Sequence, residues 1–130
     1  MKNTPTKIII HGTDVSQDLI KDQFNSTNTY HKSKDYPMSR SGLYIGYQRL
    51  ITGGKNYKVK DDDEEGAHNN STTPNGISLN LQSLGVAVGF DGDIEYMTVE
   101  HFKLLKAQVF EWQDKYDIPD SEVHYHRDWN

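Results

Sequence analysis

Short apolar runs separated by polar segments divide the chain into predicted strands. Lys7–His11 and Ser83–Phe90 are continuous apolar runs rich in β-branched residues, which is typical of strands buried on both faces. Leu43–Ile51 is also largely apolar on both faces and predicts a central strand. The sequence TGGK then turns the chain, and NYKV returns as a hairpin partner. A last strand is predicted in EVHYH, Glu122–His126.

Two stretches show helical periodicity instead. The first helix is predicted over Ser16–Ser33 with Asp14 as its N-cap, and its apolar residues recur at helical spacing at Leu19, Ile20 and Phe24. The second is predicted over Val99–Asp117, capped by Thr98 and ended by Pro119. Its apolar residues step by three and four and form one stripe that we expect to face the core: Phe102, Leu105, Val109, Trp112 and Tyr116.

The predicted order is strand, helix, two strands, loop, strand, helix, strand. This order predicts an α/β protein with one domain over residues 1–130, in which helices flank a central mixed β-sheet. Asp61–Asn80 is predicted as a long loop, and long loops inside compact domains are often functional. Its acidic run DDDEE lacks the ligand spacing of a calcium loop, so we interpret it as a solvated acidic segment.

Composition excludes several classes of function. The formal net charge of −5 argues against nucleic acid as the main partner, because domains that bind it are usually basic. The chain has no cysteine, which excludes disulfides and thiolate metal ligands within these residues. No segment is long and apolar enough for a signal peptide or a membrane span, so we expect a protein that is made in the cytoplasm. We also expect a monomer.

Two histidines stand at the ends of predicted strands. His11 comes at the end of the first strand, and His126 comes at the end of the last one. Ligand crevices in open α/β sheets form outside the carboxyl ends of the strands. Two imidazoles at one sheet edge are a start for a zinc site, although two distant histidines are more often unrelated. This pattern alone leaves both interpretations open.

Five short motifs follow one another along the chain: KIIIHGT, LYIGYQRLI, EEGAH, NLQSLGVAVGF and VHYHRD. In this order they resemble the zinc-dependent N-acetylmuramoyl-L-alanine amidases of the amidase-2 family, which includes phage lysozyme-type amidases and the peptidoglycan recognition proteins. The resemblance spans Lys7–Asp128, nearly the whole chain. It implies the fold of that family, Zn²⁺ as cofactor, and hydrolysis of the amide bond between N-acetylmuramic acid and L-alanine in peptidoglycan.

The resemblance also implies roles for individual residues. His11 and His126 match two zinc ligands. Tyr47 matches the catalytic tyrosine that points at the zinc-bound water and the substrate carbonyl. His68 matches a histidine that lines the substrate groove near the metal, so we expect it to serve in catalysis as well as binding. The expected substrate contacts are His68, Asn69 and Gln48.

The sequence departs from the family pattern at several points. Gln48 stands where the family usually has His, and Tyr125 stands where Gly usually precedes His-Arg-Asp. The family's third zinc ligand, a Cys or Asp, follows that motif after a short loop, whereas this sequence ends at Asn130. We therefore expect the third ligand beyond Asn130, in a domain clipped at its C-terminus. The strand sequence GVAVG lacks the catalytic Glu of the cytosolic anhydro-muropeptide amidases, which favours the lysozyme-like or recognition-protein branches.

Two functions follow from the resemblance. The first is a cell-wall lysin, for example a phage endolysin, that acts on peptidoglycan of the bacterial wall. The alternative is a non-catalytic peptidoglycan-binding module that keeps the groove and has lost the metal. His124, two residues before His126, is expected to be structural or to support the site from outside the ligand shell.

Overall fold

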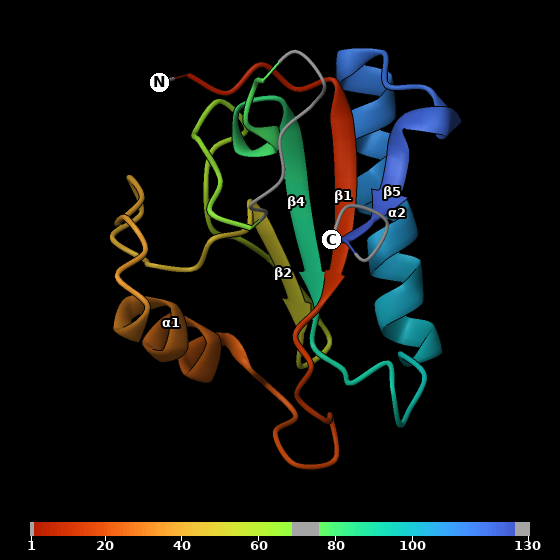
Figure 1. The fold of residues 1–130 in the computed structure, drawn as a ribbon. Helices are drawn as coiled ribbons and strands as arrows, with labels where there is room; N and C mark the ends of the chain where they lie inside the picture. Colours follow the sequence, from red (N-terminus) through yellow and green to blue (C-terminus); the bar gives the residue numbers. More distant parts are fainter. Residues whose placement is uncertain (1, 69–75, 127–130) are drawn as a thin grey trace.

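The computed structural model describes residues 2–68 and 76–126, which form a five-stranded sheet and two helices (Figure 1). The strands are β1 (Lys7–Gly12), β2 (Arg49–Thr52), β3 (Lys55–Lys58), β4 (Ser83–Val88) and β5 (Val123–Tyr125). The helices are α1 (Phe24–Ser33) and α2 (Val99–Tyr116). The predicted α/β class and the predicted order of elements are both confirmed. No helix in the described part of the chain is long and apolar enough to cross a membrane.

The sheet is mixed, with the strand order β3-β2-β4-β1-β5. The four strands β2, β4, β1 and β5 run parallel, and β3 pairs antiparallel with β2 at one edge. In the pairing of β1 with β5, Ile10 lies opposite Tyr125. A histidine follows each of these two residues, so the parallel register directs His11 and His126 to the same edge of the sheet.

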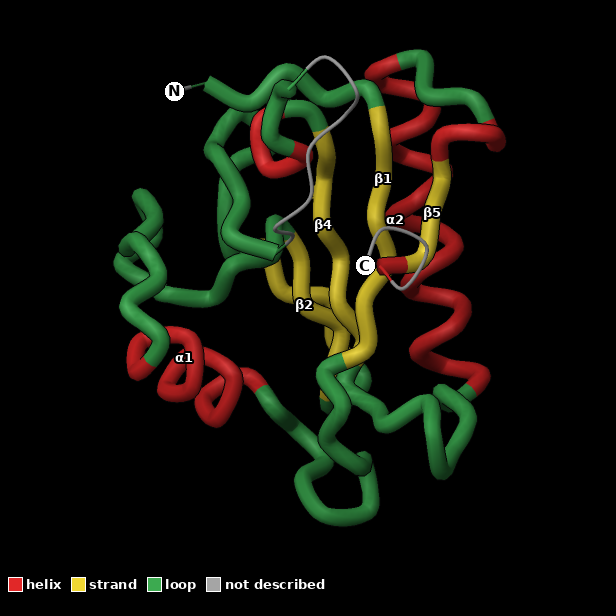
Figure 2. The backbone as a smooth tube through the Cα atoms, in the orientation of Figure 1, coloured by secondary structure: helices red, strands yellow, loops and turns green. Residues whose placement is uncertain are grey.

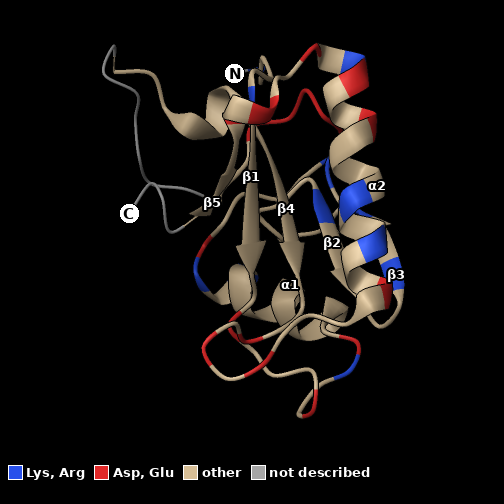
Figure 3. Cartoon of the chain, turned by 90° about the vertical axis from the view of Figure 1, so that its right-hand side faces the viewer, with Lys and Arg blue, Asp and Glu red and all other residues tan. Residues whose placement is uncertain are grey.

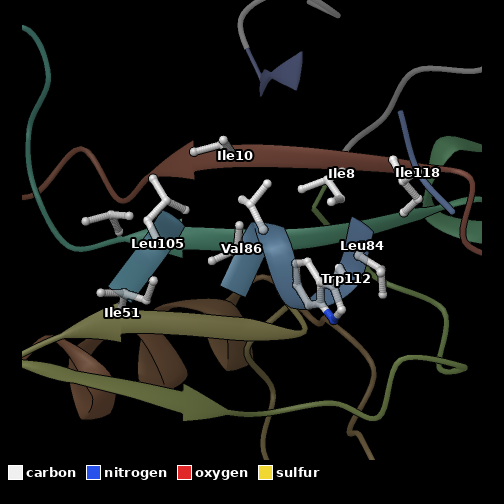
Figure 4. Close-up of a cluster of buried hydrophobic side chains, with 10 residues drawn as sticks. Ile8, Ile10, Ile51, Leu84, Val86, Leu105, Trp112 and Ile118 are labelled. Carbon is white, nitrogen blue, oxygen red and sulfur yellow. The ribbon is translucent and has the colours of Figure 1, made fainter. Parts of the chain in front are cut away.

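The main core lies between α2 and one face of the sheet (Figure 4). Its buried side chains come from three neighbouring strands and from α2, and include Ile8, Ile10, Ile51, Leu84, Val86, Leu105, Val109 and Trp112. A smaller cluster of Ile45, Leu50, Val59 and Ala87 covers the other face, where Phe24 of α1 packs against it. Each fully buried side chain of this size contributes about 1.5–3 kcal/mol to folding. The two helices thus cover opposite faces of the sheet.

The predicted cap of α2 is confirmed, but part of its predicted stripe is wrong. Thr98 Oγ1 accepts a hydrogen bond from the backbone N–H of His101. Phe102 is 51% exposed, whereas the polar residues His101 and Gln108 are buried. His101 Nε2 accepts from the Gly54 N–H, and Gln108 Oε1 accepts from the amide of Asn56. The helix therefore turns its polar residues toward the β2–β3 hairpin, and Phe102 lies at the rim.

The predicted first helix starts too early. α1 begins at Phe24, and the preceding segment is loop and turn (Figure 2). Asp14 does not cap a helix, because it lies in the left-handed region with φ 61°. The amide of Gln23 fills the loop and donates to the carbonyl oxygens of Val15 and Ile20 at 2.8 and 3.2 Å. These carbonyls are thus bonded to a side chain where a helix would bond them to later amides.

The predicted strand over Leu43–Ile51 is also too long. β2 begins at Arg49, because the backbone before it is held by groups outside the sheet ladder. The N–H of Tyr44 donates to Asn28 Oδ1 at 2.6 Å, and the N–H of Gly46 donates to His31 Nδ1 at 2.9 Å. Both acceptors belong to α1. The segment before β2 therefore docks on a helix before it enters the sheet.

The acidic run after β3 is only partly a solvated segment. Arg40 forms ion pairs with Asp61 at 3.1 Å and Asp63 at 2.7 Å on the surface. The Asp62 side chain is only 11% exposed, and its oxygens accept from Arg49 Nη2 at 3.0 Å and from the Tyr116 hydroxyl at 2.7 Å. Figure 3 shows both basic and acidic residues along α2, grouped on different turns of the helix.

Candidate functional site

A cavity of about 680 Å³ opens beyond the carboxyl ends of β1 and β5. Its walls come from the loop after β1, from α1, and from the segments around Tyr47 and His68. Four of the residues that line it are histidines: His11, His31, His68 and His126. Imidazoles can bind a metal or transfer a proton, so this cavity is a candidate site.

The structure brings together the two histidines that the sequence singled out. The ring centroids of His11 and His126 lie 4.4 Å apart with an interplanar angle of 40°. This contact follows from the parallel register, which places the two residues after Ile10 and Tyr125 side by side. His11 is 4% exposed, so its imidazole lies at the floor of the cavity.

His68 supplies a third imidazole. Its Nδ1 lies 2.9 Å from Nε2 of His11, and the two rings meet edge to face at a centroid distance of 4.9 Å. The His68 ring fits beside two glycines: a Cβ on Gly66 would lie 2.4 Å from its Cδ2, and a Cβ on Gly85 would lie 2.7 Å from it. The sequence places both glycines where a side chain would displace this ring.

Tyr47 reaches the same cluster from the segment before β2. Its ring centroid lies 5.0 Å from that of His11 and 5.3 Å from that of His31. The preceding Gly46 accepts a backbone hydrogen bond from Ala67 N–H at 3.0 Å, and a Cβ on Gly46 would lie 2.4 Å from the Ala67 carbonyl oxygen. This close crossing of two loops holds Tyr47 and His68 beside each other.

The sequence analysis missed His31 as a residue of the site. It is the one buried residue of α1, and its Nδ1 accepts from the Gly46 N–H, so it ties the helix to the loop that carries Tyr47. The available signal in the sequence was a histidine next to Tyr30 on an otherwise polar predicted helix. Asp14, which also lines the cavity, was considered only as a helix cap.

Burial keeps the histidines of the cluster neutral near pH 7. It lowers the pKa of His11, as do the neighbouring His68, His126 and His31. Burial is the main reason that the pKa of His68 falls to about 3 and that of His31 to about 4, and the nearby Lys60 adds to both shifts. Burial also lowers the pKa of His126, although Asp14 opposes the shift. The imidazoles therefore offer lone pairs and not charge.

Burial raises the pKa of Tyr47 above its usual value, and nearby Tyr36 and Asp14 add to the shift. The phenol is therefore protonated near pH 7 and can donate a hydrogen bond into the cavity.

The donor set suits a zinc ion in its chemistry. Neutral imidazole nitrogens are ordinary zinc ligands, and His11 and His126 would supply two of them. Among residues 2–68 and 76–126, however, no group of three or more His, Cys, Asp or Glu side chains has a geometry that could hold a metal ion.

The other predicted site residues lie elsewhere. Gln48 is fully buried outside the cavity, where its Oε1 accepts from the Gly85 N–H at 2.7 Å and its Nε2 donates to the Glu64 carbonyl oxygen at 3.0 Å. These hydrogen bonds tie Gln48 to β4, and its contact with substrate stays a prediction. His124 pairs with Glu122 at 3.2 Å. Asn69 lies outside the described residues.

Comparisons with known proteins place this fold. No protein-family model and no curated protein sequence matches the chain. Among solved structures, an N-acetylmuramoyl-L-alanine amidase, LysC from Clostridium intestinale, aligns with a TM-score of 0.75 and 22% identity over 98% of this chain and 74% of its own. The bumblebee peptidoglycan recognition protein PGRP-SA aligns with a TM-score of 0.71 and 20% identity over 97% and 73%.

A third similar structure is the complex of tracheal cytotoxin with the ectodomains of the peptidoglycan recognition proteins LCa and LCx. It aligns with a TM-score of 0.73 and 16% identity over 100% of this chain and 76% of the other. The predicted resemblance is therefore confirmed at the level of the fold. Over nearly its whole length, the chain has the amidase-2 fold that N-acetylmuramoyl-L-alanine amidases and peptidoglycan recognition proteins share.

Proposed function

We propose that this protein is a zinc-dependent peptidoglycan amidase. It would hydrolyse the amide bond between the lactyl group of N-acetylmuramic acid and L-alanine of the stem peptide. The observation that carries the proposal is the contact of His11 and His126 at the floor of the cavity, with ring centroids 4.4 Å apart. Two neutral imidazoles from different strands, next to a protonated tyrosine, are a typical beginning of a hydrolytic metal site.

His11 and His126 would hold the metal, with a third ligand from outside residues 2–68 and 76–126. A zinc ion in such a site supplies a Lewis acid and lowers the pKa of water toward neutrality. The amide carbonyl would lie near Tyr47, whose hydroxyl donates a hydrogen bond to the oxygen as negative charge develops on it. Hydrolysis adds water across the bond, which leaves a carboxylate on the lactyl group and a free amine on L-alanine.

Digestion of purified cell-wall sacculi tests the proposal. The protein is expected to release new α-amino groups on alanine without new reducing sugar ends, which separates an amidase from a glycosidase. Substitution of His11 or His126 by Ala should reduce this release to background. His124→Ala is the matched control, because His124 lies on the neighbouring strand and pairs with Glu122 outside the cavity. Equal release by all three variants would refute the assignment of the ligands.

A non-catalytic peptidoglycan-binding module is the second candidate. It is favoured by the lack of a third ligand among the described residues and by the recognition proteins among the similar structures. A protein that sediments with sacculi but releases no alanine amine, even with added Zn²⁺, would establish this function in place of the first.

A further inference from the structure

We propose that His68 is a positioning residue that fixes the tautomer of His11. His68 Nδ1 accepts a hydrogen bond from the Nε2–H of His11, which leaves Nδ1 of His11 as the nitrogen that carries the free lone pair. The consequence for metal binding rests on the proposed function. The tautomer itself does not, because it is a property of the metal-free chain.

The direction of this hydrogen bond follows from a chain of contacts that starts at Ser83. The Ser83 hydroxyl donates its proton to the carbonyl oxygen of Leu79. The same oxygen lies 3.4 Å from Nε2 of His68 and can only accept there, because a hydroxyl has one proton. Nε2 of His68 is therefore the protonated nitrogen of this ring.

The proton on Nε2 determines the other side of the His68 ring. In a neutral imidazole, which the burial of this ring favours, one nitrogen donates and the other accepts. Nδ1 of His68 is then the acceptor in the 2.9 Å contact with Nε2 of His11. His11 must donate, so its proton is on Nε2 and its Nδ1 is unprotonated.

The His68 ring is held firmly enough to impose this choice. It is 7% exposed, and the missing side chains of Gly66 and Gly85 make the space that it fills. Its backbone N–H donates to Asn80 Oδ1 at 3.2 Å, which fixes the chain at this point. A histidine ligand commonly uses one nitrogen for the metal and donates a hydrogen bond from the other, and loss of the acceptor typically costs 10- to 100-fold in metal affinity.

This arrangement argues against a direct role of His68 in binding metal or substrate. Both of its ring nitrogens already have partners inside the protein, His11 on one side and Ser83 on the other. A ligand or a substrate contact would have to break one of these hydrogen bonds.

The test is the tautomer of His11 in the metal-free protein, measured by two-bond ¹H–¹⁵N NMR spectra of histidine-labelled samples. The native protein should show His11 protonated on Nε2. His68→Phe keeps a ring but removes the acceptor, so His11 should become a mixture of tautomers and Zn²⁺ affinity should fall about 10- to 100-fold. His68→Asn should restore the Nε2–H tautomer and most of the affinity, because its Oδ1 takes the place of Nδ1.

Two further variants make the result decisive. His124→Phe is the control and should change neither the His11 tautomer nor Zn²⁺ affinity. Ser83→Ala removes the acceptor for Nε2 of His68 with a small change in volume, and it should loosen the tautomers of both His68 and His11 even if His68→Phe does not fold.

The proposal is overturned if native His11 is protonated on Nδ1, or if its tautomer is unchanged in a folded His68→Phe or Ser83→Ala protein. A spectrum of the zinc-loaded protein with the metal on a nitrogen of His68 would also overturn it. If the native protein binds no Zn²⁺ but shows the expected tautomers, the positioning role stands and the proposed function fails.

Discussion

At the scale of single residues, the site depends on groups that burial keeps uncharged. His11, His68 and His31 have lowered pKa values, and Tyr47 has a raised one, because the low-dielectric interior disfavours charge. The residue types at these positions can be read from the sequence. Their protonation states cannot, because these depend on burial and on the neighbouring side chains. The family resemblance pointed to His11, Tyr47, His68 and His126. It did not point to His31, whose hydrogen-bond partner is a backbone amide distant in sequence.

Tyr47→Phe tests the assigned role of the hydroxyl. The phenyl ring keeps the contacts with His11 and His31, so the fold and the Zn²⁺ affinity should be nearly unchanged. Loss of the hydrogen bond to the developing oxyanion should lower kcat by about 100- to 1,000-fold, with a smaller effect on KM. The measurement is the initial rate of alanine-amine release from a soluble muramyl peptide. A variant with the native kcat would remove Tyr47 from the reaction.

At the scale of elements, the site is assembled by loops that dock on one another. The segment before β2 bonds to α1 through Asn28 and His31, and it crosses the segment that carries His68 at Gly46 and Ala67. Local patterns predicted both α1 and β2, but they gave the wrong starting residues. The reason is that buried side chains such as Gln23 and His31 hold the backbone there, and neither periodicity nor propensity reports such long-range hydrogen bonds.

Gly46→Ala tests the close crossing of the two loops. The new Cβ would lie 2.4 Å from the Ala67 carbonyl oxygen, so backbone must move, and the expected loss is about 1–3 kcal/mol in the free energy of unfolding. The measurement is urea denaturation followed by circular dichroism. Gly92→Ala is the control, because its Cβ would meet only the Phe90 ring at 3.5 Å and should be nearly neutral. Equal midpoints for the two variants would show that the crossing is not tight.

At the scale of the whole molecule, the site exists because two strands distant in sequence are neighbours in the sheet. β1 and β5 are parallel and in register, which brings His11 and His126 together across more than a hundred positions of the chain. The sequence predicted both strands and the α/β class, since continuous apolar runs identify buried strands. The pairing of β1 with β5 could be anticipated only from the resemblance, because strand order is set by packing of the whole sheet and not by local pattern.

The central claim is that His11 and His126 bind one zinc ion. The most direct measurement is an anomalous difference map, recorded at the zinc absorption edge, from crystals of the zinc-loaded protein. We expect one peak about 2.0–2.1 Å from a ring nitrogen of His11 and equally close to a ring nitrogen of His126. A peak that contacts neither imidazole, or the absence of a peak at this edge of the sheet in zinc-saturated crystals, would contradict the account.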